Sequence, residues 1–158
     1  MRTHVSASVR LAVMAVLLCA GCAAQSLPMR YPSQPQAGMT REQLDKDERA
    51  CVDVAAQARA ERAWAYIGCM ISRGHSTAVG FQVQMAPTLM AVTQTKPHEP
   101  IVAAAEVEGC RKAGYAAGRA QGGSRDAIVN QMETAFRECL APLGYTVRRQ
   151  PPPAAARR

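Results

Sequence analysis

The sequence contains two matching stretches of ten residues, YIGCMISRGH at positions 66–75 and FRECLAPLGY at positions 136–145. In each stretch an aromatic residue stands three positions before a cysteine, a glycine stands five positions after that cysteine, and a ring-bearing residue follows the glycine. Each stretch is preceded by an alanine-rich segment with another cysteine, Cys51 or Cys110. The repeat predicts two similar units, each with its own pair of cysteines.

The second unit shows the clearer helical pattern. Residues 100–120 are rich in alanine and valine, the glycines at 122–123 interrupt this segment, and Ser124 can cap a second helix. Apolar residues recur in that second helix at three- and four-residue spacing and define one face: Ile128, Met132, Ala135, Phe136, Cys139, Leu140 and Leu143. An antiparallel hairpin would bring Cys110 close to Cys139, because the two lie nearly equidistant from the turn.

The first unit also begins with a helix. Thr40 and Gln43 form a capping box, which marks a helix start. The apolar stripe that runs through Cys51 does not continue to Trp64. At about 100° per residue, the bulky residues from Trp64 onward lie on largely the opposite side of the helix from Cys51. We therefore expect a bend near residues 59–62, although neither glycine nor proline marks it.

Four cysteines fall within the two units: Cys51, Cys69, Cys110 and Cys139. Four thiols in an oxidising compartment most simply form two disulfides, and the bend and the hairpin favour the pairs Cys51–Cys69 and Cys110–Cys139. The other pairings stay open, because connectivity is not readable from sequence alone. If the first unit were one straight helix, Cys51 and Cys69 would stand about 27 Å apart and would need partners in the second unit.

The connector between the units has the weakest pattern. Residues 81–85 alternate between apolar and polar side chains as a strand would, and Pro87 can turn them back toward residues 89–92. A short β-hairpin is therefore compatible with this segment.

These patterns predict a mainly α-helical fold. We expect two hairpin-like units, residues 40–76 and 99–147, within one disulfide-stapled domain, residues 40–147. The composition of residues 22–39 is typical of a flexible, disordered tether, and that of residues 148–158 is typical of a disordered tail rich in proline and arginine.

The N-terminus has the layout of a secretory signal peptide, which we assign to residues 1–21. Two arginines precede the apolar run 11–18, and small residues follow it. The AGC at positions 20–22 resembles the lipobox of bacterial lipoproteins, in which the cysteine sulfur takes a diacylglycerol and becomes the first residue of the mature chain. One position departs from that family, because Cys19 stands where it usually has leucine.

The lipobox resemblance implies a covalent lipid on Cys22 and no other cofactor. Because Ala23 follows Cys22 in place of aspartate, the resemblance implies sorting to the outer membrane, with the domain on its periplasmic face. The partners would then be the membrane, through the lipid anchor, and an envelope protein. The alternative is ordinary cleavage after Ala24, which would leave a secreted, soluble, helical periplasmic protein that begins at Gln25.

The net charge of +7 does not indicate a nucleic-acid partner. Between Thr40 and Val147 the sequence has 12 basic and 12 acidic residues, so the excess positive charge lies in the N-terminal segment and the tail. The predicted domain is therefore electroneutral and offers no basic face with interleaved aromatic residues for binding phosphates.

The sequence predicts neither an enzyme nor a metal site. It has no GxSxG, no HExxH and no glycine-rich phosphate loop, so no catalytic residue is assigned. His75, Met85, Met90 and His98 are the conceivable ligands of a soft metal, which keeps a soft-metal carrier as an alternative function. Methionine fills cores far more often than it binds metal, however, and the four cysteines lack a CxxC spacing, so no metal ligand is assigned.

The cysteine pattern also resembles that of small exported bacterial lipoproteins of unknown function. In those proteins a helical cysteine is followed by an ending of the form aromatic-x-x-Cys-Met-x-x-Arg-Gly-aromatic. This resemblance supplies no chemistry and names no small-molecule substrate. The sequence thus predicts a binding or structural accessory module of the cell envelope.

Overall fold

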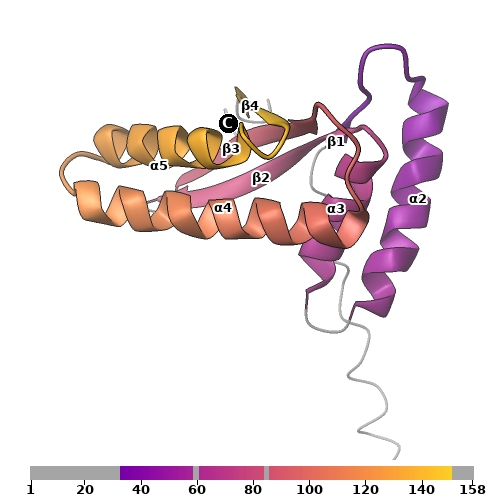
Figure 1. Cartoon of the computed structure of the whole chain (residues 1–158), viewed down its shortest axis with the longest axis horizontal. Helices are drawn as coiled ribbons and strands as arrows, with labels where there is room; N and C mark the ends of the chain where they lie inside the picture. Colours follow the sequence, from indigo (N-terminus) through magenta and orange to yellow (C-terminus); the bar gives the residue numbers. More distant parts are fainter. Residues whose placement is uncertain (1–32, 59–60, 84–85, 151–158) are drawn as a thin grey trace, which may run out of the picture. The chain divides into compact units, whose positions relative to one another are not determined.

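A computed structural model describes residues 33–150, apart from 59–60 and 84–85. The described part is mainly helical and adds a small antiparallel sheet in the order β1-β2-β3-β4 (Figure 1). Its elements are β1 (Ser33–Gln34), α2 (Arg41–Gln57), α3 (Arg62–Ser72), β2 (Ser76–Val83), β3 (Ala86–Gln94), α4 (Pro100–Gln121), α5 (Arg125–Leu140) and β4 (Tyr145–Gln150).

The sheet is more extensive than the short hairpin compatible with the sequence. β2 and β3 pair from Thr77, opposite Val92, to Val83, opposite Ala86, and β4 then pairs with the other edge of β3. The chain reverses between Val83 and Ala86, so the expectation that Pro87 forms the turn was wrong. Pro87 lies within β3, opposite Gln82.

Both expected boundaries of the folded domain need correction. Residues 22–39 were predicted to be a tether, yet Ser33 and Gln34 form β1 and pair with Thr77 and Ser76 of β2. The tail was predicted to begin at position 148, yet β4 continues to Gln150. Arg149 Nε donates a hydrogen bond of 2.8 Å to Glu133 of α5, so a residue assigned to the tail has an ion-pair partner within the fold. The rest of the predicted tether and tail lies outside the described residues.

The first unit bends where the phase of its apolar stripe changes. α2 begins after Thr40, whose hydroxyl accepts a hydrogen bond of 3.1 Å from the Gln43 N–H, and it ends at Gln57. α3 begins at Arg62, which confirms the expected bend. The disulfide Cys51–Cys69 joins the two helices with 5.6 Å between the Cα atoms.

The second unit is the predicted antiparallel helical hairpin. α4 ends at two glycines with positive φ, and Ser124 caps α5 by accepting a hydrogen bond from the Ala127 N–H. The disulfide Cys110–Cys139 joins the two helices with 5.5 Å between the Cα atoms. Both disulfides are therefore the pairs that the sequence favoured.

The core extends from α2 and α3 to α4, α5 and the sheet, and one part of it lies where the second unit packs on the sheet. Val79, Phe81 and Val83 alternate along β2 and are buried. The Phe81 ring contacts Phe136 of α5 at 5.1 Å and Tyr115 of α4 at 5.2 Å, measured between ring centroids. The alternation that predicted a strand thus reflects contact with α4 and α5.

Helices α3 and α4 approach each other closely at Gly68, and this contact connects the two units. A Cβ atom at Gly68 would lie 2.2 Å from the backbone oxygen of Pro100 and 2.8 Å from Cβ of Ala104. Both of these neighbours belong to α4, which cannot shift without breaking its own packing. Only glycine therefore fits at this crossing.

We expect Gly68→Ala to lower the free energy of unfolding by about 3 kcal/mol, the upper part of the range for overpacked positions. Chemical denaturation followed by the fluorescence of Trp64, the single tryptophan, measures this loss. Gly109→Ala is the matched control at protein concentrations where the chain is monomeric, because a Cβ there meets nothing of the same chain within 4 Å. The control should gain about 1 kcal/mol from helix propensity. Equal effects at the two glycines would contradict the close approach of α3 and α4.

Candidate functional site

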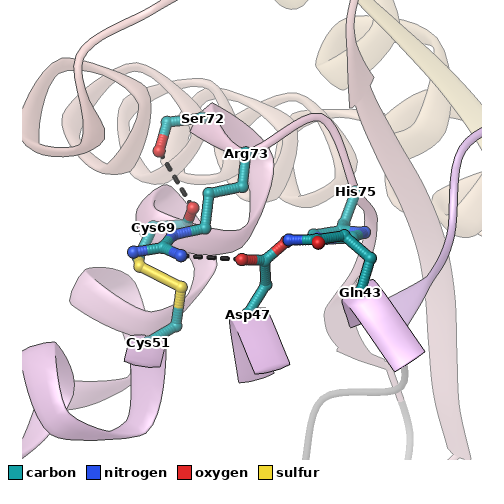
Figure 2. The surroundings of a disulfide bond; sticks show 7 residues. All are labelled: Gln43, Asp47, Cys51, Cys69, Ser72, Arg73 and His75. Carbon is teal, nitrogen blue, oxygen red and sulfur yellow. Dashed lines mark hydrogen bonds and ion pairs between the residues drawn. A yellow bond between two sulfur atoms is a disulfide. The ribbon is translucent and has the colours of Figure 1, made fainter. Parts of the chain in front are cut away.

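The most connected polar group of the first unit is the carboxylate of Asp47, a buried residue of α2 (Figure 2). Its Oδ1 atom accepts a hydrogen bond of 2.7 Å from Arg73 Nη1. Its Oδ2 atom lies 2.9 Å from Gln43 Nε2 and 2.8 Å from His75 Nε2. We call Asp47 with these three partners the Asp47 cluster.

The neighbouring disulfide and one glycine position the Asp47 cluster. Asp47 lies one helical turn before Cys51, so the two residues share a face of α2. Cys51 holds Cys69 of α3, and α3 ends at Ser72. Gly74 follows two residues later, and its φ of +85° lets the chain turn sharply into β2. This turn brings Arg73 and His75, which flank the glycine, onto the carboxylate (Figure 2).

The partners of Asp47 keep it ionised. Burial by itself would raise the pKa of Asp47, but the hydrogen bonds from Gln43, His75 and Arg73, together with the positive charge of Arg73, lower this pKa from 3.8 to about 2. Because an ionised carboxylate only accepts hydrogen bonds, His75 Nε2 is the protonated ring nitrogen that donates to it. The His75 side chain is fully buried, so this hydrogen bond is shielded from water.

The second unit has an equivalent cluster, formed around Glu106 of α4. The Tyr145 hydroxyl donates a hydrogen bond of 2.5 Å to Glu106 Oε2, and His98 Nδ1 lies 3.3 Å from the same oxygen. The His98 ring stacks on the Tyr145 ring with 4.5 Å between centroids. Burial, and then the hydrogen bond and charge of Glu106, raise the pKa of Tyr145 well above its usual value, so this phenol stays protonated.

The two clusters occupy matching positions of the sequence repeat. Asp47 stands four residues before Cys51, and Glu106 stands four residues before Cys110. In both units the ring that binds the carboxylate directly follows a glycine with positive φ, Gly74 or Gly144. Each unit therefore joins its first helix to its second helix through the cystine, and to the start of a strand through a carboxylate and a ring.

Sequence reasoning missed both carboxylates, although a signal was present. It used Gln43 only as part of a capping box, whereas the Gln43 side chain donates to Asp47. An acidic residue at the same offset from the first cysteine of each unit was the signal that could have identified the pair.

A third polar arrangement covers the outer edge of β2. Arg111 of α4 donates a hydrogen bond of 2.7 Å from Nε to the Gly80 oxygen, and the Tyr115 hydroxyl accepts one of 2.8 Å from the Gln82 N–H. The Arg111 guanidinium lies 5.5 Å from the ring centroid of Trp64 and 4.9 Å from that of Tyr115. Side chains of α4 thus take the hydrogen-bonding positions that a further strand would use.

The residues considered as soft-metal ligands lie in different surroundings. His75 Nε2 binds Asp47, His98 Nδ1 faces Glu106, and Met90 is buried in the hydrophobic core. Met85 lies outside the described residues. Within residues 33–150, gaps excepted, no group of three or more histidine, cysteine, aspartate or glutamate side chains is arranged to hold a metal ion.

The predicted lipidation residue, Cys22, lies outside the described residues, as does Cys19. Among the helices that are described, none is both long enough and apolar enough to cross a bilayer.

No protein-family model matches the chain, and neither a curated protein nor a solved structure matches it significantly. The functional proposal therefore depends on the residues of this chain and their geometry.

Proposed function

We propose that this protein is a lipoprotein of the outer membrane, anchored by a lipid on Cys22, whose folded domain is a rigid binding or structural module on the periplasmic face. The AGC at positions 20–22, directly after a short apolar run, is the observation that carries the proposal. Its match to the lipobox gives the sulfur of Cys22 a specific chemical role.

The two disulfides support export to an oxidising compartment. Three of the four cysteines, Cys51, Cys69 and Cys110, are almost completely buried. Such bonds must form while the chain folds, in a compartment that oxidises thiols, and the bacterial periplasm does so. The cytosol, by contrast, keeps thiols reduced.

The polar clusters support a structural role for the domain's buried charges. Asp47 accepts hydrogen bonds from three side chains of the same chain, and Glu106 accepts one from Tyr145. A carboxylate whose acceptor positions are already occupied by internal donors is poorly placed to take a proton from a substrate. The clusters stiffen the two units, which suits a module that presents a fixed surface.

The anchor would keep the domain close to the membrane. Ser33, the first residue of β1, comes 11 residues after Cys22 in the sequence. Even a fully extended segment of this length spans at most about 40 Å. The module would therefore meet partners in the outer membrane or directly beneath it.

Replacing Cys22 tests the anchor directly. We expect cells that produce the full chain to incorporate a tagged palmitate into it, and we expect Cys22→Ser to abolish the label and release the protein from membranes. Cys19→Ser is the matched control, because the proposed cleavage discards Cys19, and this variant should stay labelled and membrane-bound. An unlabelled, soluble wild-type chain that begins at Gln25 would establish the alternative cleavage after Ala24 and refute the lipid anchor.

A further inference from the structure

The solvent-facing side of α4 carries an apolar stripe. Its residues are exposed: Ile101, Val102, Ala105, Gly109, Ala113, Ala116 and Ala120. Ile101 is 80% exposed and Val102 is 43% exposed, which places both among the few exposed large hydrophobic residues of the described chain. From Val102 onward the spacing is three or four residues, so the stripe follows one face of the helix.

Gly109 lies at the middle of this stripe and has no role in packing within the described chain. A Cβ atom there would meet nothing within 4 Å, whereas one at Gly118 of the same helix would lie 2.3 Å from Cγ of Met132. Glycine in a helix interior is destabilising relative to alanine. Its benefit at an exposed position is that a second backbone can approach closely.

The charges of α4 and its N-cap are divided between the two halves of the helix. Glu106 and Arg111 are bound within their own chain. Of the other charges, the acidic residues Glu99 and Glu108 precede Gly109, whereas the basic residues Lys112 and Arg119 follow it. Two such helices are electrostatically complementary when they run antiparallel, because each acidic half then faces a basic half. Antiparallel helix dipoles also attract each other.

We propose that the exposed face of α4 binds α4 of a second copy of this chain, antiparallel, about a two-fold axis that passes close to Gly109. The stripe is symmetric about this residue, since Val102 and Ala116 are equally distant from it, as are Ala105 and Ala113. A two-fold contact requires such self-complementarity, because the same surface serves on both protomers. Ile101 of one protomer then packs near Ala116 of its partner and leaves water.

Charges beside the two-fold axis also pair across the interface. Glu108 already binds Lys112 of its own helix at 2.6 Å, and the Lys112 side chain is 72% exposed. In the antiparallel pair Lys112 of each protomer also faces Glu108 of its partner, which gives a ring of four alternating charges. The interface stands independently of the lipid on Cys22.

Single cysteines placed along α4 test both the contact and its direction. With the full chain purified and its two native disulfides oxidised, we expect Gly109→Cys to give a disulfide-linked dimer under mild oxidation, because position 109 meets its own copy at the axis. We expect Ala120→Cys to remain monomeric, because its two thiols would lie about 33 Å apart. Ala56→Cys, on the exposed surface of α2, is the control for random collision and should also remain monomeric.

The pattern of cross-links decides among the alternatives. Cross-linking at positions 109 and 120 but not at 56 would mean a parallel pair and refute the proposal. Equal cross-linking at all three positions, or none at 109, would refute it as well. Cross-linking of the Gly109→Cys variant in intact cells to a different protein, with no dimer of the chain, would overturn the proposal by showing that another partner occupies this face.

A bulky variant provides an independent readout. We expect Gly109→Gln to change the mass measured by light scattering from dimer to monomer at concentrations where the wild type is dimeric. At concentrations where both proteins are monomeric, its melting temperature should not fall below that of the wild type, because within one chain the new side chain enters open space and favours the helix. Ala56→Gln should leave the dimer intact. A wild-type chain that is monomeric throughout the concentration series would overturn the proposal.

Discussion

Asp47→Ala is expected to lower the free energy of unfolding by about 3 kcal/mol, because it leaves buried donors without an acceptor. His75 is fully buried and donates to Asp47 through Nε2, and this nitrogen has no second hydrogen-bond partner within the described chain. Arg73 and Gln43, which are more exposed, can turn to water, so they contribute less to the loss. Urea denaturation followed by Trp64 fluorescence measures the change.

Asp45→Ala is the matched control for Asp47. It removes the same side chain from the same helix, but Asp45 is 46% exposed and pairs only with Arg41, one turn away. Exposed pairs of this kind contribute about 0.5 kcal/mol or less. A loss at Asp47 no larger than that at Asp45 would contradict the buried cluster.

The contribution of Asp47 also depends on pH in a defined direction. Its pKa is about 2 in the folded chain and 3.8 in the reference state, so the unfolded chain binds a proton first as the pH falls. The stabilisation is complete above about pH 4, declines as the pH falls from 3.8 toward 2, and is lost below that. The difference in stability between wild type and Asp47→Ala should therefore shrink over this interval, and a constant difference would argue against an ionised Asp47.

Removing the first disulfide is the second large effect. The double variant Cys51→Ala/Cys69→Ala should lose about 3 kcal/mol, the entropy of closing the loop between two residues 18 positions apart. The real loss should be somewhat larger, because both side chains are buried and alanine leaves their sulfur volume empty. Denaturant unfolding of the oxidised protein measures it.

Cys110→Ala/Cys139→Ala is the comparison for that variant. Its loop spans 29 residues, so loop entropy alone predicts a loss of about 3.5 kcal/mol. Cys139 is only partly buried, however, so less packing is lost with it. Peptide mapping of the non-reduced chain checks the pairing first, and a peptide that links Cys51 to Cys110 or Cys139 would refute this whole comparison.

The helical part of the fold was predictable because its signals are local. Thr40 and Ser124 cap helices through hydrogen bonds that reach only three residues along the chain. The glycines at 122–123 stop α4 by their own backbone conformation. Helix geometry favoured the two cystine pairs, since each joins helices that are consecutive in sequence, but it left the other pairings open.

The sheet was harder to predict because its partners are distant. β4 pairs with β3 across the whole second helical unit, and Thr93 lies opposite Thr146. The last three residues of β4, 148–150, read as the start of an arginine-rich tail, and only the contact of Arg149 with Glu133 and the pairing with β3 place them in the fold. Neither contact leaves a trace in the residues next to these positions.

The sequence by itself determined two helical units with their caps and turns, favoured the cystine within each unit, and contains the AGC on which the proposed anchor depends. Tertiary structure alone decided that Asp47 and Glu106 accept hydrogen bonds from His75 and Tyr145, that β3 joins the two units in one sheet, and that one face of α4 has no intrachain partner within the described residues. The physical reason is the distance along the chain over which each interaction acts. Caps and helical periodicity act within a few residues, whereas Asp47 and His75 are 28 positions apart and Glu106 and Tyr145 are 39, so these pairs exist only once the chain has packed.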